Sequence, residues 1–567
     1  MAKNANVGKG NKNPKLTKPA KQKPASLGDD TSSIITRWGT VGFLAVSGLI
    51  FILTRINLLA IPLERDEGSF AYIGHWLFRG RELYTDMLDS KLPGLYTIYG
   101  VSTALFGYNS TGVHMGLFLA NIVSAICIFL LARNIYNVLV ATLATSFFLF
   151  LVISPNVVGF ASHATQLLTP FLLGGLLLFW KGIQSRRTIL FFFAGLLIGI
   201  SFTIKQQAAI YGVLLAVLWW PARLRWYKQE DSRIPIMEWL VLGIGGLIPL
   251  VMVVGYFAAV GRLGDFYNWT VVQPFSLAGS YRQPWYELFL NILPRVISGF
   301  EGIWFLAGAG LVFIFISGFK KGVSLFGASM GLLGIISVAI GAAYYSHYFI
   351  LAMPGIAILA ACTLNWVAIK TGKAGTFISL LIGGILVIWS MKGRTDYFFY
   401  PDYAKIHFNS YSYNMFPELE KIGKELGKRV KEGERIGIMG SEPEVLVAAD
   451  RESCSRYLMV YAMLIDPVLS PPMQEEWMQS MKDCAPEYIV YNTYQTSWAP
   501  NYDKLKFFLE FMPWVEQNYE GIGIAESRGP RPGIVLWDEE AKSHQSESDY
   551  KVIVLKRKDV QATPAVQ

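Results

Sequence analysis

The residues able to do chemistry stand in short polar clusters between long apolar segments. The first cluster, Glu64-Arg65-Asp66-Glu67, directly follows an apolar segment. A carboxylate in this place can act as a general base toward an acceptor hydroxyl or amine. Alternatively, Asp66 caps a helix that begins near Ser69, because acidic side chains favour helix N-termini. Position alone leaves both interpretations open.

Two lysines have the type and position to bind a phosphate. Lys91 stands in Asp89-Ser-Lys-Leu-Pro93-Gly94, beside a proline that can begin a helix. A lysine beside a helix N-terminus suits a phosphate, although Lys91 could instead pair with Asp89 and extend to the lipid headgroups. Lys205 interrupts two apolar runs, and an ionisable residue there indicates function. The alternative for Lys205 is a solvated loop lysine.

Two histidines, His163 and His347, also stand in turns between apolar segments, and Tyr345 precedes the second. A lone histidine is more often a structural hydrogen-bonding residue than a base or a ligand. A functional role becomes more favoured when all the candidates are taken together, because the turns that carry them all fall on one side of the predicted membrane. The sequence therefore predicts one site that gathers Asp66, Lys91, His163, Lys205 and His347.

The elements that position these residues are membrane-spanning helices. Of 567 residues, 53% are hydrophobic and 16% are charged, against roughly 25% charged in soluble domains. The net charge of +9 does not indicate nucleic-acid binding, because seven lysines lie in a Lys-, Pro- and Asn-rich tail before Asp29. This tail, within residues 1–34, is expected to be disordered and cytoplasmic. The composition predicts a polytopic α-helical membrane protein.

About eleven segments approach the length of a spanning helix, roughly 20 apolar residues. They lie near 38–57, 113–132, 137–154, 164–180, 188–204, 206–220, 238–260, 298–318, 322–343, 349–367 and 375–391. With the N-terminal tail in the cytoplasm, five Lys- and Arg-rich turns also fall on the cytoplasmic side, as the positive-inside rule requires. The candidate site and everything after Met391 are then on the outer side.

Three domains are predicted: the tail, a transmembrane catalytic domain over 35–391, and an extracytoplasmic α/β domain over 392–567. Within the second, the outer loop 58–112 has two apolar stretches, 69–79 and 93–106, that are too short to span and suit interfacial helices. In the third, strand-like runs at 435–439, 487–491 and 551–555 alternate with helical segments.

The four cysteines divide between the two larger domains. Cys127 and Cys362 fall inside predicted spans and are expected to be packed thiols. Cys454 and Cys484 lie in the outer domain, where an oxidising environment permits a disulfide. Two separate buried thiols are the alternative.

Four motifs together resemble those of the C-fold (GT-C) glycosyltransferases that use polyprenyl-phosphate sugars. The motifs are Arg65-Asp-Glu-Gly68, Asp89-Ser-Lys-Leu-Pro-Gly94, Lys205-Gln206 and Ser346-His-Tyr-Phe349. The pattern is most similar to glycosyltransferase family 39, the protein O-mannosyltransferase-like proteins, and to the lipid A aminoarabinose transferases. The resemblance covers about 35–400 and implies a GT-C-like fold.

The resemblance implies roles for the clustered residues. Asp66 would be the general base, supported by Glu67, and Lys91, Lys205 and Arg282 would bind the donor phosphate. The cavity would be lined by Asp89, His163, Gln166, Tyr345 and His347. Many relatives carry an acid where this chain has Gln166, so no metal ligands are predicted and a divalent metal is doubtful. No cofactor is predicted.

The implied activity is inverting transfer of a sugar from a polyprenyl-phosphate donor to a glycan, lipid or protein acceptor at the outer face of the cell membrane. A phosphodiester leaves readily when fixed cations stabilise it. The alternative is a transporter or flippase of a lipid-linked saccharide, because interrupted helices such as the one around Lys205 mark transporter substrate sites. The absence of symmetry between the halves of the chain disfavours it.

Overall fold

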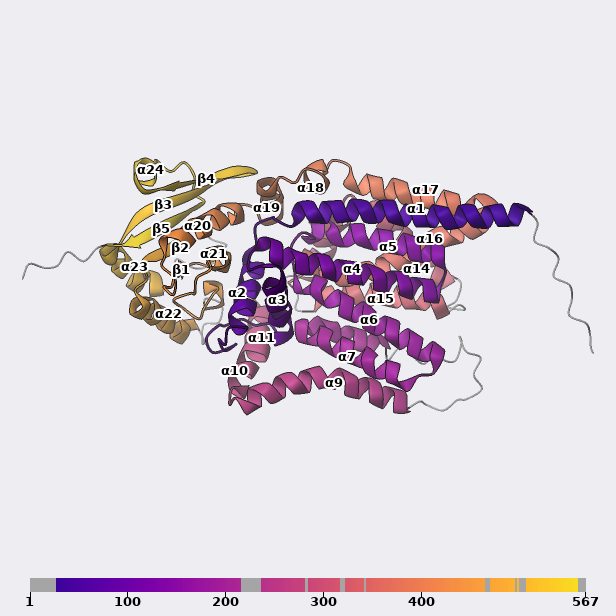
Figure 1. Cartoon of the computed structure of the whole chain (residues 1–567), viewed down its shortest axis with the longest axis horizontal. Helices are drawn as coiled ribbons and strands as arrows, with labels where there is room; N and C mark the ends of the chain where they lie inside the picture. The colour runs from indigo at the N-terminus through magenta and orange to yellow at the C-terminus, as the bar shows by residue number, and fades with distance from the viewer. Residues whose placement is uncertain are drawn as a thin grey trace, which may run out of the picture.

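The computed structural model describes residues 27–215, 236–280, 284–316, 322–340, 343–463, 470–494, 497–498 and 506–558. A long helical bundle continues at one end into a smaller domain built on a β-sheet (Figure 1). The predicted fold class, a polytopic helical protein with a C-terminal sheet domain, is confirmed. The predicted basic tail before residue 27 and Arg282 lie outside the described residues.

Helices occupy ten of the eleven segments predicted to span. They are α1 (Leu27–Leu58), α4 (Ser110–Ile135), α5 (Val138–Ile153), α6 (Ala164–Ser185), α7 (Thr188–Ile204), α9 (Ile236–Ala259), α14 (Glu301–Ile316), α15 (Gly322–Ala339), α16 (Met353–Thr371) and α17 (Gly375–Met391). The segment 206–220 is described only to residue 215, with the 3₁₀ turn η2 (Gln206–Ala208) followed by helix over 209–215.

In the described chain, five helical stretches are long and apolar enough to cross a membrane, or six when a bent pair counts as one span. One of the five, Met353–Met391, contains both α16 and α17. The helices α5, α7 and 326–339 of α15 are apolar but shorter. The chain is therefore a multi-pass membrane protein, and several helices are shorter than a full span.

The two ends of the bundle differ in charge. Ser110, at the start of α4, donates a hydrogen bond to Glu420 of the sheet domain (3.0 Å), so α4 ends away from that domain. Connectivity puts the end of α6 and the α16–α17 turn at the same remote end (Figure 1). The remote turns carry Arg133, Lys181, Arg186, Arg187, Lys370 and Lys373. The two other predicted basic clusters, within 216–235 and 317–321, lie outside the described residues.

Short helices cover the end of the bundle next to the sheet. The two predicted interfacial stretches are α2 (Arg65–Leu77) and α3 (Pro93–Phe106), the latter with proline in its first turn. They pack closely, since a Cβ atom on Gly74 would lie 2.6 Å from the backbone nitrogen of Gly100. Further short segments follow α9: α10 (Leu263–Tyr267), η3 (Asn268–Val272), α11 (Gln273–Ser280), α12 (Trp285–Glu287), η4 (Leu288–Ile292) and α13 (Leu293–Ile297).

The sheet domain begins after α17 with the short helices α18 (Thr395–Phe398) and α19 (Tyr403–Tyr411). Its sheet has the order β1-β2-β5-β3-β4, parallel between β1 and β2 and antiparallel elsewhere. The strands are β1 (Gly437–Met439), β2 (Tyr488–Asn492), β3 (Tyr519–Arg528), β4 (Arg531–Trp537) and β5 (Lys551–Arg557). The helices are α20 (Phe416–Arg429), α21 (Pro443–Ala449), η7 (Val460–Met463), α22 (Ser470–Cys484), α23 (Lys506–Asn518) and α24 (Asp538–Ser543).

Three strands match the runs predicted at 435–439, 487–491 and 551–555, whereas the β3–β4 hairpin was not predicted. Its turn contains Gly529 with φ of +68°, in the sequence Arg528-Gly-Pro-Arg531. A Gly-Pro pair between two extended runs is a turn signal that could have identified the hairpin.

The sheet domain is fixed to the first outer loop. Arg81 forms an ion pair with Glu452 (2.7 Å), and the Leu88 N–H donates to the Arg456 carbonyl (3.0 Å). Cys454, between these contacts, forms a disulfide with Cys484 of α22, with their Cα atoms 5.7 Å apart. Of the two alternatives for these cysteines, the structure has the disulfide. Cys127 and Cys362 are free thiols, as predicted.

Candidate active site

The three neighbouring carboxylates at the start of α2 differ in their hydrogen bonds. Glu64 is the N-cap: its side chain accepts from the Glu67 N–H (2.9 Å), and the Glu67 carboxylate accepts from the Glu64 N–H (3.2 Å). This reciprocal pair is a capping box. Asp66 is partly buried, and its carboxylate makes no hydrogen bond or ion pair with the described atoms. Capping, the alternative interpretation of Asp66, is therefore done by Glu64.

Glu67 is fully buried and connects three segments. Besides the capping contact, it accepts from His114 Nε2 of α4 (3.0 Å) and from the Ser162 N–H. Burial alone would raise the pKa of Glu67, but His114 and the Ser162 N–H outweigh burial and lower it. A carboxylate with this many partners fixes α2 against the turn that precedes α6.

The two lysines approach each other because α3 begins beside the end of α7. A Cβ atom on Gly94 would lie 2.7 Å from the Thr203 carbonyl oxygen, so only glycine fits there. Lys205 is 8% exposed, with its Nζ 3.7 Å from the centre of the Tyr348 ring. Burial, and after it the nearby Lys91, hold the pKa of Lys205 well below its usual range. An anion bound between the two lysines would relieve this repulsion.

The two predicted histidines stack on each other. The rings of His163 and His347 are nearly parallel, with centroids 3.9 Å apart, and the Tyr345 ring is also nearly parallel to that of His347, with centroids 5.7 Å apart. His163 Nε2 is buried and has no hydrogen-bond partner among the described atoms. Burial, followed by His163 and Lys205, holds the pKa of His347 well below its usual range.

Three side chains of the site could together hold one metal ion. Ligand atoms of Glu64, Asp66 and His163 lie within 4.8 Å of one another. One imidazole nitrogen and carboxylate oxygens suit a divalent transition metal, and the unpartnered Nε2 of His163 is consistent with such a ligand. Burial, followed by Asp66 and Glu67, holds the pKa of Glu64 well above its usual range, a repulsion that a cation would offset. No motif in the sequence predicts this set of ligands.

The other predicted site residues have different surroundings. Asp89 accepts from the Ser69 hydroxyl (3.3 Å) and the Ser90 N–H, and no ion pair joins it to Lys91 in the described structure. Gln166 is buried. Its Nε2 donates to the Gly159 carbonyl (3.0 Å) and its Oε1 accepts from Asn121 (3.0 Å). The Gln166 side chain therefore shapes the turn before His163 from within the protein.

The sheet domain contributes a tyrosine that was not predicted from the sequence. Tyr461 of η7 lies near Asp66 and Asp89, and burial followed by these two carboxylates holds its pKa well above the usual range. Arg65, beside Asp66, reaches the same domain through an ion pair with Glu442 (3.3 Å). Tyr461 belongs to no recognisable motif, so only the packing of the two domains identifies it.

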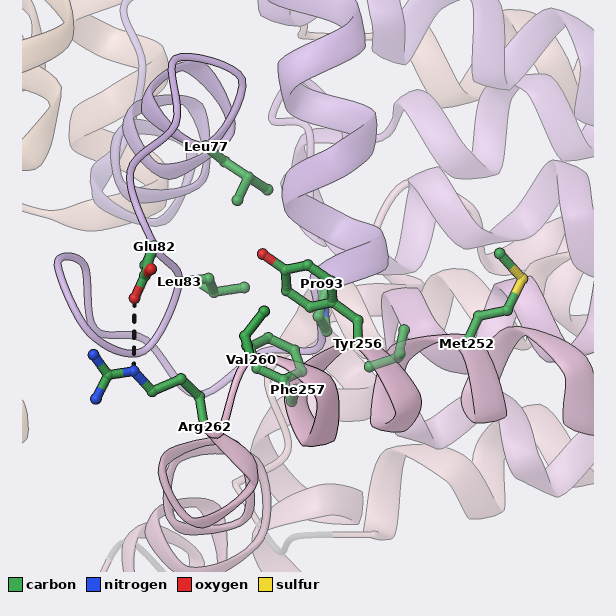
Figure 2. Close-up of a pocket in the computed structure, with 10 residues that line it drawn as sticks. Leu77, Glu82, Leu83, Pro93, Met252, Tyr256, Phe257, Val260 and Arg262 are labelled. Atoms are coloured by element: carbon green, nitrogen blue, oxygen red, sulfur yellow. Dashed lines mark ion pairs between the residues drawn. The ribbon is translucent and has the colours of Figure 1, made fainter.

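The same end of the molecule has an apolar groove (Figure 2). It has a volume of about 290 Å³ and runs between the first outer loop and the end of α9. An ion pair between Glu82 and Arg262 (3.6 Å) lies at one side. The apolar part of the lining consists of Leu77, Leu83, Pro93, Met252, Val253, Tyr256, Phe257 and Val260. Since Pro93 lies two residues after Lys91, the groove adjoins the cationic part of the site.

Residues 90–255 match the family model of the dolichyl-phosphate-mannose-protein mannosyltransferases. Comparison with curated proteins finds no match. The matched region includes Lys91, His163 and Lys205, three of the candidate site residues.

Solved structures of C-fold glycosyltransferases share the architecture. ArnT from Cupriavidus metallidurans bound to undecaprenyl phosphate is similar with a TM-score of 0.58 at 13% identity, over 92% of this chain and 98% of that chain. The apo state of ArnT has a TM-score of 0.57, over the same 92% of this chain and 98% of that chain. The Archaeoglobus fulgidus oligosaccharyltransferase tethered with an acceptor peptide gives 0.51 at 12% identity, over 89% of this chain and 74% of that chain. The GT-C fold implied by the sequence motifs is confirmed.

Proposed function

We propose that the protein is an inverting glycosyltransferase that moves a sugar from a polyprenyl-phosphate donor to a hydroxyl or amine acceptor. The observation that carries this proposal is the Asp66 carboxylate, which has no hydrogen-bond partner in the described structure and lies near the buried basic residues His163 and Lys205 at the end of the bundle. A carboxylate free to accept a proton, beside basic side chains whose charged form a donor phosphate would favour, suits a displacement at a sugar phosphate.

The donor would bind through both of its chemical parts. Lys91 and Lys205 would contact the phosphate, and the apolar groove beside Pro93 would receive the first isoprenoid units. We include Arg282 among the phosphate contacts as a prediction from the sequence alone. ArnT, which has the same fold, has been crystallised with undecaprenyl phosphate, and the matched family model is named for a dolichyl-phosphate sugar.

In the reaction, the acceptor oxygen or nitrogen forms a bond to the anomeric carbon while the bond from that carbon to the phosphate oxygen breaks. Asp66 takes the acceptor proton, and the electron pair leaves with the polyprenyl phosphate, whose charge Lys91 and Lys205 stabilise. One displacement inverts the anomeric configuration. Glu67 positions Asp66 through the capping box and the His114 contact. A divalent metal, if bound by Glu64, Asp66 and His163, would supply further positive charge.

The reaction would take place at the outer face of the cell membrane, with the N-terminus in the cytoplasm. Two observations support this orientation. The basic turns lie at the end of the bundle remote from the sheet domain, as expected for cytoplasmic turns (Figure 1). The disulfide between Cys454 and Cys484 suits an oxidising compartment.

Reconstitution with a radiolabelled polyprenyl-phosphate sugar tests the proposal. In proteoliposomes, we expect the label to leave the lipid, either by transfer to an acceptor or by slow hydrolysis when water replaces the acceptor. Movement of intact labelled lipid between leaflets, with no release of sugar, would contradict the proposal and favour a transporter or flippase.

A further inference from the structure

A second cavity lies at the same end of the bundle and is polar where the donor groove is apolar. It has a volume of about 390 Å³, and we refer to it as the α18–α19 cavity. Its walls come from the 155–158 turn, α13, Ser346, the turn that follows α17, and the helices α18 and α19. Hydrogen-bonding side chains in the lining include Asn156, Ser346, Asn409 and Ser410.

The lining of this cavity is predominantly cationic. Of its three basic residues, Lys405 forms an ion pair with Asp396 (2.5 Å), the acidic residue of the lining. Arg394 donates through Nη2 to Asn156 Oδ1 (3.3 Å) and to the Ser298 carbonyl (3.0 Å). Its Nη1 is buried without a hydrogen-bond partner among the described atoms. Glu301 attracts Arg394 electrostatically, but within the described chain no ion pair joins them.

Arg295, on α13, is the third basic residue. It is exposed and makes no hydrogen bond or ion pair in the part of the chain that the structure describes. Arg295 therefore has donors available on the cavity, and Arg394, which also lines it, has one guanidinium nitrogen without a hydrogen-bond partner in the described structure. Guanidinium groups bind phosphates through paired hydrogen bonds, which makes a phosphate the ligand that this lining suits best.

The cavity shares its walls with the candidate active site. Ser346 lines it, and the next residue, His347, stacks on His163. Pro155, Asn156 and Val158 line it, and the same turn continues to Ser162, which contacts Glu67. Figure 1 shows α18 and α19 at the opposite edge of the bundle end from α9, which borders the donor groove.

We propose that the α18–α19 cavity binds a phosphate group of the acceptor, and so that the acceptor is a phosphate-bearing molecule. This inference rests on the proposed glycosyltransferase function. An inverting displacement needs the acceptor to approach from the side opposite to the leaving phosphate, so donor and acceptor need separate entries. An apolar groove at one edge and a cationic cavity at the other provide two such entries.

Phosphate binding can be measured independently of turnover. The purified protein in nanodiscs would be titrated with inorganic pyrophosphate, and in parallel its retention of phosphatidic acid against phosphatidylcholine would be measured by native mass spectrometry. The variants are Arg295→Gln and Arg394→Gln, with Arg528→Gln, an exposed arginine of the sheet domain outside this cavity, as the matched control. Arg295→Gln remains informative if Arg394→Gln does not fold.

We expect each cavity variant to bind the phosphate probe at least about tenfold more weakly, on the scale of one hydrogen bond to a charged group. Donor hydrolysis should stay unchanged in these variants, and Arg528→Gln should bind the probe as the wild type does. Binding of pyrophosphate in the wild type identifies a free phosphate ligand, and binding of phosphatidic acid alone identifies a lipid headgroup.

Wild-type affinity in both cavity variants, equal loss in Arg528→Gln, or no binding of either probe by the wild type would overturn the inference. Failure of the wild type to consume donor would instead contradict the proposed function, so the two failures are distinguishable.

Discussion

At the scale of single residues, neighbouring groups of the same type have different tasks. Of the three carboxylates in Glu64 to Glu67, two are held in a capping box, and Asp66 has no hydrogen-bond partner in the described structure. The sequence could predict that this cluster matters, because acids directly after an apolar segment are uncommon. It could not predict which acid caps α2, since capping preference and catalysis favour the same residue types.

Lys205 gives a prediction about pH. Its pKa is lowered by burial and by Lys91, and an anionic donor binds the charged form of the lysine. Donor affinity should therefore fall as pH rises through this lowered pKa, by up to about tenfold per pH unit. In Lys205→Arg the side chain stays charged, so the affinity should be nearly constant from about pH 7 to 10. Equilibrium binding of the donor lipid across this range checks it. The same pH dependence in both proteins would assign the titration to another group.

At the scale of elements, helix positions were predictable and close contacts were not. The apolar segments predicted the helices because lipid requires long apolar runs, and Pro93 marked the start of α3. The contact between Gly94 and Thr203, which brings Lys91 near Lys205, joins residues far apart in sequence and has no local signal. The same holds for Tyr461, which reaches the site only because the sheet domain packs on α2.

The Gly94 contact can be tested directly. In Gly94→Ala, the added Cβ would press on the Thr203 backbone and separate α3 from the end of α7. We expect donor affinity to fall by about tenfold or more, since the two phosphate contacts would no longer converge. The control is Gly243→Ala in α9, where a Cβ meets nothing within 4 Å and binding should stay unchanged. Equal affinity in both variants would show that this close approach does not position the lysines.

The disulfide of the sheet domain gives a prediction about stability. Cys454 and Cys484 close a loop with a sequence separation of 30. In the chain-entropy model, a loop of this size stabilises a domain by about 3–4 kcal/mol. The double variant Cys454→Ser, Cys484→Ser should therefore unfold at lower temperature, as followed by thermal scanning. An unchanged unfolding temperature would assign the stability of the domain to its packed core.

At the scale of the whole molecule, the sequence predicted that five turns meet on one face, and the structure brings them to one end of the bundle. Charge in the turns and alternation of apolar segments were sufficient for that result. The sequence also predicted the fold, because its four motifs occur in the same order as in the GT-C glycosyltransferases that they resemble. The donor groove and the α18–α19 cavity were not predictable, because each is formed by segments that meet only in the folded chain.

Orientation in the membrane is a property of the whole molecule and can be measured by cysteine labelling. Ser543 in the sheet domain and Ser185 at the end of α6 are both exposed. In intact cells, an impermeant maleimide should modify Ser543→Cys but not Ser185→Cys, which should react only after the membrane is opened. The reverse pattern would put the sheet domain in the cytoplasm and contradict the proposed outer-face site.

The most direct test of the central claim is the turnover of Asp66→Asn with a polyprenyl-phosphate sugar donor. This substitution keeps the size of the side chain and removes its ability to accept a proton. We predict that kcat falls by about 10² or more while donor affinity and thermal stability stay near those of the wild type, because Asp66 has no structural partner in the described chain. Near-normal kcat in folded, membrane-inserted Asp66→Asn would contradict its role as the base.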